Sequence, residues 1–190
     1  MDQPITCAWA MNSELERDYH DTVWGVPVYD DQVLFEFLTL EGAQAGLSWL
    51  TVLKKREGYC QAFANFDIEA LARYDDSHID LIIERYDVIK NRRKIASVFT
   101  NAQATLRLQK EYGSLSNALW QFVDGQPQMN HWQSQQDIPA YTDASQAMSR
   151  FLKSHGFKFV GPTICYALMQ ATGMVNDHLI NCPRYHAVQT

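Results

Sequence analysis

Residues 38–56, LTLEGAQAGLSWLTVLKKR, place one carboxylate, Glu41, among apolar residues and glycines. Residues 30–40 begin with two aspartates that can cap a helix and continue with apolar side chains on nearly every side, which predicts a helix buried in the core. Gly42 is expected to end this helix in a left-handed conformation, so that Glu41 lies in its last turn. Because backbone carbonyl groups make a helix C-terminus negative, an acid at this position indicates function rather than stability.

The segment that follows, GAQAG at residues 42–46, has almost no side-chain bulk, so its backbone can approach another molecule closely. Leu47 is expected to protrude next, and Ser48 to cap a helix that turns Trp49 inward. A small loop with one leucine at its tip has the shape of a wedge. The alternative is that Leu47 packs into the core, as leucines between helices usually do.

Cap residues and apolar positions at one-face spacing predict helices along most of the chain. The expected helices begin near residues 67, 75, 91, 115, 143 and 162, and glycines at 113, 156 and 173 are placed to end three of them. No sustained alternation of β-branched residues is present, so the sequence predicts an all-α fold. We expect one domain over residues 1–190, in which the glutamine-rich stretch 124–142 forms an irregular connection between two possible helical lobes.

Composition limits the classes of partner. The formal net charge of −6 argues against a protein that coats nucleic acid by bulk attraction. Cations are nevertheless concentrated at residues 54–56, 90–94 and 153–158. Such clusters are usually solvated helix faces, but three that converge could hold phosphates.

No apolar run approaches membrane-spanning length, and the first residues lack a secretory signal. We therefore expect a cytoplasmic protein with no membrane partner, acting as a monomer. The four cysteines are widely spaced, which in a reducing compartment favours buried thiols or metal ligands over disulfides.

A possible metal site involves both ends of the chain. Cys7 and His20 lie near one end, and His178 and Cys182, four residues apart, would share one face of a helix near the other. Two cysteines and two histidines suit a closed, structural zinc site. Spacing alone favours unrelated thiols and histidines, because the separation of Cys7 and His20 matches no compact zinc finger. A bound zinc would tie the chain ends together.

Residues 143–171 predict two helices joined by a tight turn that contains Val160 and Gly161, with Pro162 at the first helical position. This order is typical of a helix-hairpin-helix, in which amide N–H groups of the turn bind a DNA phosphate. Taken alone the pattern is weak, because most glycines before a helix only form its cap.

Seven short motifs together point to one family. In chain order they are CAW at 7–9, YHD at 19–21, WGVP at 24–27, LEG at 40–42, AGLSW at 45–49, GFKFVG at 156–161 and NDH at 176–178. They resemble the type I 3-methyladenine DNA glycosylase family from Cys7 to about Cys182. The resemblance implies a bacterial base-excision repair enzyme of the helix-hairpin-helix superfamily that flips 3-methyladenine out of alkylated double-stranded DNA and releases it as the free base.

The resemblance also implies the roles of particular residues. A structural zinc would be bound by the two cysteines and two histidines named above. Glu41 and Tyr19 would act on the extruded base, Trp9 and Trp49 would stack on it, Gly46 and Leu47 would fill the space it leaves, and Val160 and Gly161 would contact DNA. Adenine methylated at N3 is cationic while it is attached to the sugar, so aromatic faces and one carboxylate favour it over neutral adenine.

Two positions depart from expectation. Many members of the wider superfamily carry an aspartate after the hairpin helix, whereas this chain has Asn176 with Asp177 beside it, and we do not expect Asp177 to be an active-site base. Glu16, three residues before Tyr19, stands where the family carries another aromatic residue. If that position lines the pocket, base selectivity could differ.

Two other functions remain open on the sequence alone. The same wedge and hairpin could belong to a module that binds damaged DNA without cleaving it. A zinc hydrolase built on Asp177 and His178 is disfavoured, because no His-Glu-x-x-His pattern is present and four ligands would close the site.

Overall fold

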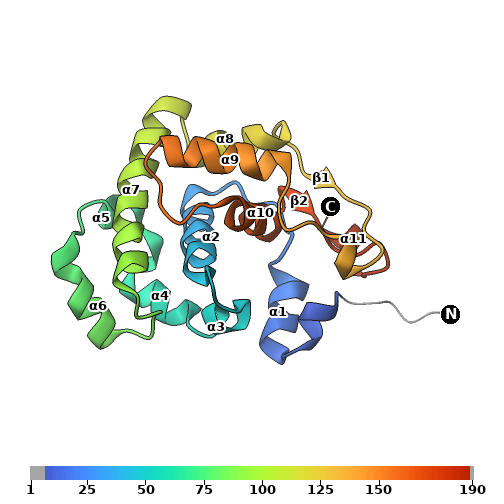
Figure 1. Cartoon of the computed structure of the whole chain (residues 1–190), viewed down its shortest axis with the longest axis horizontal. Coiled ribbons are helices and arrows are strands. Elements are labelled where there is room, and N and C mark those ends of the chain that lie inside the picture. Colours follow the sequence, from blue (N-terminus) through green and yellow to red (C-terminus); the bar gives the residue numbers. More distant parts are fainter. Residues whose placement is uncertain (1–6, 189–190) are drawn as a thin grey trace.

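Helix α2 (Asp31–Gln44) lies at the centre of the molecule and carries Glu41 (Figure 1). The computed structural model describes residues 7–188. Every residue of α2 from Phe37 to Ala43 is buried, as its apolar sequence predicts. Asp30 caps the helix, because its carboxylate accepts a hydrogen bond of 2.9 Å from the backbone N–H of Val33.

Asp31 has a different role from Asp30. Its carboxylate accepts hydrogen bonds of 2.8 Å from the backbone N–H groups of Leu115 and Ser116, at the start of the later helix α8. The first turn of α2 is thereby joined to a segment more than eighty residues away in the sequence.

The prediction of a mostly helical chain is confirmed. The other helices are η1 (Ala8–Met11), α1 (Glu14–Thr22), α3 (Trp49–Leu53), α4 (Arg56–Ala62), η2 (Ala64–Phe66), α5 (Ile68–Leu71), η3 (Asp76–His78), α6 (Ile79–Arg85), α7 (Arg92–Tyr112), α8 (Leu115–Trp120), η4 (Gln121–Val123), η5 (Gln135–Asp137), α9 (Asp143–Ser154), α10 (Pro162–Ala171) and α11 (Arg184–Ala187). The described residues also include two short strands, β1 (Gln128–Met129) and β2 (Val175–Asn176), which pair in parallel.

The predicted helix boundaries follow from the expected caps. The side chain of Asn91 accepts a hydrogen bond from the backbone N–H of Lys94 at the start of α7, and Gly113 ends that helix with a φ of +85°. Thr142 caps α9 in the same way, through the N–H of Ser145. These boundaries are local features, which explains why they could be read from the sequence.

Gly42 does not end α2, and this prediction is wrong. The helix continues to Gln44, and the left-handed glycine that follows is Gly46, with a φ of +78°. A Cβ atom on Gly42 would lie 3.4 Å from the Cβ and carbonyl oxygen of Phe159. Gly42 therefore allows α2 to pack closely against the connection between α9 and α10, which is the other reason for a glycine within a helix.

Helix α10 lies between α2 and α9, while α7 runs along one side of the molecule (Figure 1). Residues 124–142 connect α8 to α9, and their strand β1 pairs with β2 near the C-terminal end. The buried apolar side chains form one contiguous cluster that includes residues from Cys7 to Cys182. The division into lobes remains a prediction. None of the described helices combines the length and the apolar character needed to cross a membrane.

Candidate functional site

A cavity of about 210 Å³ opens beside α2, bounded by side chains of η1, α1, α3 and α10. Its lining residues are Trp9, Tyr19, Trp24, Glu41, Gln44, Trp49, Gln135, Ala167 and Gln170. The four residues that the family resemblance assigns to the base, Trp9, Tyr19, Glu41 and Trp49, therefore lie around one cavity. They come from four separate elements, which only the tertiary structure brings together.

Glu41 is the ionisable group in the wall of this cavity. It is 4% exposed, and its Oε2 atom finds no hydrogen-bond partner among residues 7–188. Burial raises the pKa of Glu41 from 4.5 to about 8, because the charged form has lost its water. The carboxyl group therefore holds a proton in much of the free protein at neutral pH. A cation or a hydrogen-bond donor in the cavity would favour the ionised form.

Tyr19 and Trp49 carry two further polar atoms without partners. The hydroxyl of Tyr19 and the Nε1 of Trp49 are buried and make no hydrogen bond within the part of the chain that the structure describes. The two rings lie close together, with centroids 5.1 Å apart. Burial, and then the charge of nearby Glu41, raise the pKa of Tyr19 well above its usual value. Buried polar atoms are nearly always hydrogen-bonded, so three unsatisfied ones around one cavity indicate a ligand that supplies the missing partners.

Trp9 and Trp24 complete the aromatic wall. Their rings meet edge to face with centroids 5.1 Å apart, and the centroid of Tyr19 lies 6.3 Å from that of Trp9. Sequence reasoning missed Trp24 as a lining residue, although it stands in one of the seven motifs. It also missed the glutamines at 44, 135 and 170, which carry no sequence signal that separates them from surface glutamines.

Glu16 does not bring a charge into the cavity. It is 7% exposed, and the lining formed by the described residues does not include it. Its carboxylate accepts a hydrogen bond of 2.9 Å from the hydroxyl of Ser13, the residue that caps α1. The acid at this position therefore serves the start of α1.

Leu47 lies at the surface, and the prediction that it protrudes is confirmed. It is 40% exposed, and it follows Gly46, around whose missing Cβ no atom of the described residues lies within 4 Å. The start of the loop is fixed to α7 by Lys94. Its Nζ donates hydrogen bonds to the carbonyl oxygens of Ala43 at 2.8 Å and Ala45 at 2.7 Å. These carbonyls belong to the negative C-terminus of α2, where a lysine is favourable.

Residues 155–161 connect α9 to α10, and Val160 within this connection is not exposed. Its side chain is 1% exposed, and its carbonyl oxygen accepts a hydrogen bond of 2.6 Å from Ser149 on α9. Only the backbone around Gly161 could therefore approach a partner. Arg93 and Lys158 line one groove beside this turn.

Two of the three cations at residues 54–56 form ion pairs with carboxylates of the protein. In the first cluster, Lys55 pairs with Asp87, and Arg56 pairs with Glu36 at 2.6 Å. Most of the charge at residues 54–56 is therefore already balanced within the protein.

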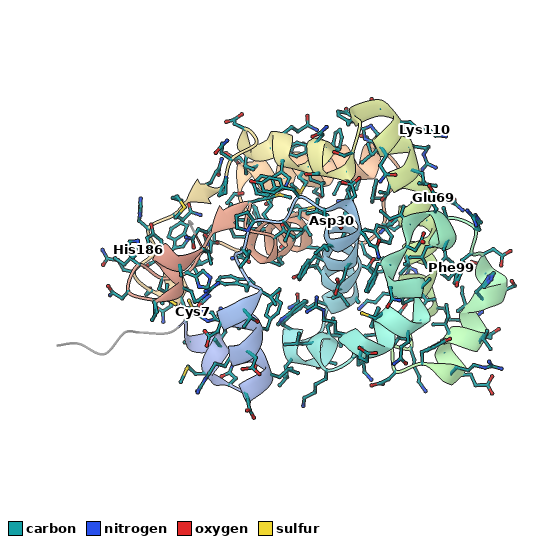
Figure 2. All side chains as sticks on the ribbon, turned by 180° about the vertical axis from the view of Figure 1, so that it is seen from behind. Cys7, Asp30, Glu69, Phe99, Lys110 and His186 are labelled. Atoms are coloured by element: carbon teal, nitrogen blue, oxygen red, sulfur yellow. The ribbon has the colours of Figure 1, made fainter. Side chains whose placement is uncertain are left out.

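The proposed metal ligands lie close together in space, although two are near one end of the sequence and two near the other. They are Cys7, His20, His178 and Cys182. Figure 2 shows Cys7 beside the C-terminal segment. All four side chains are buried, and their ligand atoms lie within 4.8 Å of one another. His178 and Cys182 lie in the loop before α11 and not on one helix, so that prediction is wrong. The loop serves as well, because it brings the Sγ of Cys182 to 3.8 Å from the Nδ1 of His178.

Four of the six distances between these ligand atoms are close to the edges of a tetrahedral site. The Nε2 of His20 lies 3.1 Å from the Nδ1 of His178 and 3.6 Å from the Sγ of Cys182, and the Sγ of Cys7 lies 3.9 Å from the Nδ1 of His178. Usual zinc–sulfur and zinc–nitrogen bond lengths give tetrahedral edges of about 3.3–3.8 Å. The group can therefore hold a metal ion of this size.

The surroundings of the four side chains also suit a metal. The Nδ1 of His20 lies 2.7 Å from the carboxylate of Asp21, and the Nε2 of His178 lies 3.1 Å from the carbonyl oxygen of Trp24. Metal-bound histidines commonly donate their second N–H to such acceptors. Hydrogen bonds from Cys7 and the two histidines lower the pKa of the Cys182 thiol, and the same contact with Cys182 raises that of Cys7, so Cys182 is the thiol that ionises first.

Asp177 stands next to this group but does not open into the base cavity. It is 1% exposed, and its two oxygens accept four hydrogen bonds, at 2.6 and 2.8 Å on each oxygen. A carboxylate saturated in this way is a poor base. This supports the expectation that Asp177 is not catalytic, and it also argues against a hydrolase built on this residue.

Comparisons with known proteins find relatives over nearly the whole chain. A family model described as methyladenine glycosylase matches residues 9–185. The chain is 44% identical to DNA-3-methyladenine glycosylase 1 of Escherichia coli (strain K12), covering 94% of this chain and 96% of the relative. It is 43% identical to DNA-3-methyladenine glycosylase of Haemophilus influenzae (strain ATCC 51907 / DSM 11121 / KW20 / Rd), covering 93% and 96%.

Solved structures give the same result. The structure of 3-methyladenine DNA glycosylase I from Staphylococcus aureus matches with a TM-score of 0.91 at 37% identity, covering 94% of this chain and 95% of the other. A variant of 3-methyladenine DNA glycosylase I in complex with 3-methyladenine matches with a TM-score of 0.90 at 36% identity, covering 94% and 96%. Sequence and fold therefore agree over nearly the whole length, and the chain belongs to the methyladenine glycosylase family.

Proposed function

We propose that this protein is a monofunctional DNA glycosylase that releases 3-methyladenine from alkylated double-stranded DNA as the first step of base-excision repair. The observation that carries the proposal is the aromatic cavity in which Glu41, Tyr19 and Trp49 each keep a buried polar atom without a partner. Relatives named for this activity, with 43–44% identity over nearly their whole length, support the choice of substrate.

The chemistry requires little beyond binding. The N-glycosidic bond of a nucleotide methylated at N3 breaks with its electron pair going to the base, which cancels the positive charge. Water adds to the sugar carbon and releases one proton to the solvent. Ionised Glu41 stabilises the cationic substrate in the cavity, and the faces of Trp9 and Trp49 add cation–π attraction. Glu41 is buried, so its attraction for a cation is stronger than it would be in solution.

The loop at Gly46 and Leu47 is proposed to enter the duplex where the base has left the stack. The exposure of Leu47 and the nearness of this loop to the end of α2 support this role. The pair α9 and α10 is proposed to act as a helix-hairpin-helix, with the backbone at Gly161 and the cations Arg93 and Lys158 facing a phosphate.

Zinc is the metal that best fits the group of two cysteines and two histidines, because tetrahedral sites with these ligands are characteristic of structural zinc. The four residues would bind it at a place separate from the base cavity, where it would stabilise the fold. A cytoplasmic location remains our expectation, since the unpaired cysteines suit a reducing compartment.

The test is to incubate the protein with DNA treated with a methylating agent and to identify the released bases by chromatography. We expect free 3-methyladenine, and we expect Glu41→Gln to release much less of it while still binding the DNA. Binding of methylated DNA without release of any base would instead support the non-catalytic module.

A further inference from the structure

Gln170 on α10 lines the cavity, and the structure fixes the orientation of its amide. The Nε2 of Gln170 lies 2.8 Å from Oδ2 of Asp177. Every group within hydrogen-bond distance of the two oxygens of Asp177 is a donor, and the nitrogen of the Gln170 amide, not its oxygen, is the atom that can donate. The Oε1 of Gln170 is therefore turned away from Asp177, and no hydrogen bond to it is found among residues 7–188, so it can accept one from a ligand.

Asp177 is itself locked in place. Its Oδ1 accepts hydrogen bonds from the side chains of Asn130 at 2.6 Å and Trp132 at 2.8 Å, and its Oδ2 also accepts one from the hydroxyl of Tyr166 at 2.6 Å. These donors come from residues 124–142 and from α10. Reversing the amide of Gln170 would place its oxygen against Oδ2 of Asp177, which is an acceptor, so the hydrogen bond would be replaced by repulsion.

An acceptor held in this way matters for the choice of base. Adenine carries an exocyclic amino group, a donor, at the position where guanine carries an oxygen, an acceptor. A protein oxygen fixed at this place attracts the amino group of adenine and repels the oxygen of guanine. Glu41 also accepts hydrogen bonds when it is ionised, but it can become a donor by taking up a proton, whereas Gln170 cannot change in this way.

We propose that Gln170, oriented by Asp177, is a specificity-determining residue that accepts a hydrogen bond from the exocyclic amino group of the flipped purine and so disfavours bases with an oxygen at that position. Asp177 is a positioning residue in this arrangement, because it acts only through Gln170. The inference rests on the proposed function, since it concerns the same cavity and the same class of substrate.

The test compares two free bases of the same shape. 3-Methyladenine carries the amino group, and 3-methylhypoxanthine carries an oxygen in its place. Each is titrated into the protein while the fluorescence of the cavity tryptophans is followed. We expect the native protein to prefer 3-methyladenine, and Gln170→Met, which keeps the length of the side chain but removes the acceptor, to reduce this preference by about tenfold.

The matched control is Gln109→Met. The Nε2 of Gln109 also donates a hydrogen bond of 2.8 Å to an aspartate, Asp31, and neither residue lines the cavity. Its loss should lower the unfolding temperature to an extent similar to that of Gln170→Met while leaving the preference between the two bases unchanged. If both variants weaken both bases equally, Gln170 has only a structural role and the inference is wrong.

A second variant tests the role of Asp177. In Asp177→Asn an amide replaces the carboxylate, so Gln170 can turn its oxygen toward residue 177 and its nitrogen toward the cavity. We expect the preference for 3-methyladenine to fall further than in Gln170→Met, because a donor now faces the amino group. A preference that matches that of the native protein in a folded Asp177→Asn would overturn the positioning role.

The outcomes separate this inference from the proposed function. If the native protein binds neither base and releases no 3-methyladenine from methylated DNA, the proposed function fails. If the native protein does both and Gln170→Met keeps the native preference, only the inference fails.

Discussion

The burial of the Glu41 carboxyl group lowers the stability of the fold and prepares the group to bind a ligand. The carboxyl group is buried at the end of α2, with one oxygen unpaired among the described residues, and its pKa is raised to about 8. The alternative, that Glu41 is a structural acid paired with Tyr19, is not supported, because the Tyr19 hydroxyl also lacks a partner there. Stability is lost where the cavity must receive a ligand.

The raised pKa of Glu41 predicts a pH dependence of stability. Between pH 4.5 and about 8 the unfolded chain has lost the proton that the folded protein keeps, so the unfolded state binds fewer protons. The free energy of unfolding contributed by Glu41 therefore falls as pH rises through this window and levels off above about pH 8. Glu41→Gln removes this loss, so we expect the variant to unfold near the native temperature at about pH 5 and several degrees higher at about pH 8.

Calorimetry at both pH values tests this prediction. Glu84→Gln, which changes an exposed acid on α6, is the control and should show no such divergence from the native protein. A constant difference between Glu41→Gln and the native protein at all pH values would show that the Glu41 carboxyl group is not desolvated.

The same substitution predicts a loss of binding. Glu41→Gln removes the negative charge and presents N–H donors where the base needs acceptors. A charge-assisted hydrogen bond contributes about 1.5–3 kcal/mol, so the affinity for free 3-methyladenine should fall about ten- to a hundredfold. Fluorescence titration near pH 8, where the native carboxyl group ionises, measures the change. Unaltered affinity would remove Glu41 from the recognition of the base.

At the scale of elements, the wedge loop depends on how α2 ends. The helix runs to Gln44, Gly46 turns the chain, and the ammonium group of Lys94 from α7 binds two of the last carbonyl oxygens. The loop that carries Leu47 is thereby fixed to two helices, so an apolar side chain can remain exposed without collapsing onto the surface. A rigid, exposed leucine is suited to inserting into a base stack.

Leu47→Ala should therefore slow the release of 3-methyladenine from duplex DNA about tenfold or more while leaving the affinity for the free base nearly unchanged. Leu81→Ala is a matched control, because Leu81 on α6 is 42% exposed and Leu47 is 40% exposed. Single-turnover release and titration with the free base are measured on all three proteins. If Leu47→Ala weakens both quantities equally, Leu47 supports the pocket instead of entering the duplex.

At the scale of the whole molecule, side chains from the two end regions of the chain lie close together. These side chains are Cys7, His20, His178 and Cys182. A metal bound there closes a loop of nearly the full chain, which restricts the unfolded state and links metal affinity to folding. The site is buried and lies outside the lining of the base cavity, so it bears on stability more than on chemistry.

We expect protein purified without chelators to contain one zinc per chain by elemental analysis. Cys182→Ala should lose the metal and unfold at a clearly lower temperature, yet below that temperature it should bind 3-methyladenine within about threefold of the native affinity. Cys165→Ala, which removes another buried thiol, should keep the zinc. Native protein that contains no zinc would contradict this prediction.

Most of the helices and their ends could be predicted from the sequence. Asn91 caps a helix through a bond to a residue three positions away, and Gly113 ends that helix by its own backbone conformation. These signals depend on residues that are close in the sequence, so they can be recognised without knowledge of the tertiary structure. The motifs around Tyr19, Glu41 and Trp49 also carried enough information to indicate the family.

Long-range packing decided the remaining features, because it depends on which surfaces meet. Gly42 was predicted to stop a helix, and only its contact with Phe159 shows that it permits close packing instead. Gln170 gave no signal in the sequence, since its role depends on the saturated carboxylate of Asp177 and on a cavity assembled from separate helices. The sequence by itself determined the elements and the kinship of this protein, whereas the tertiary structure decided which polar atoms are left to meet a ligand, because burial and partners are properties of the folded chain alone.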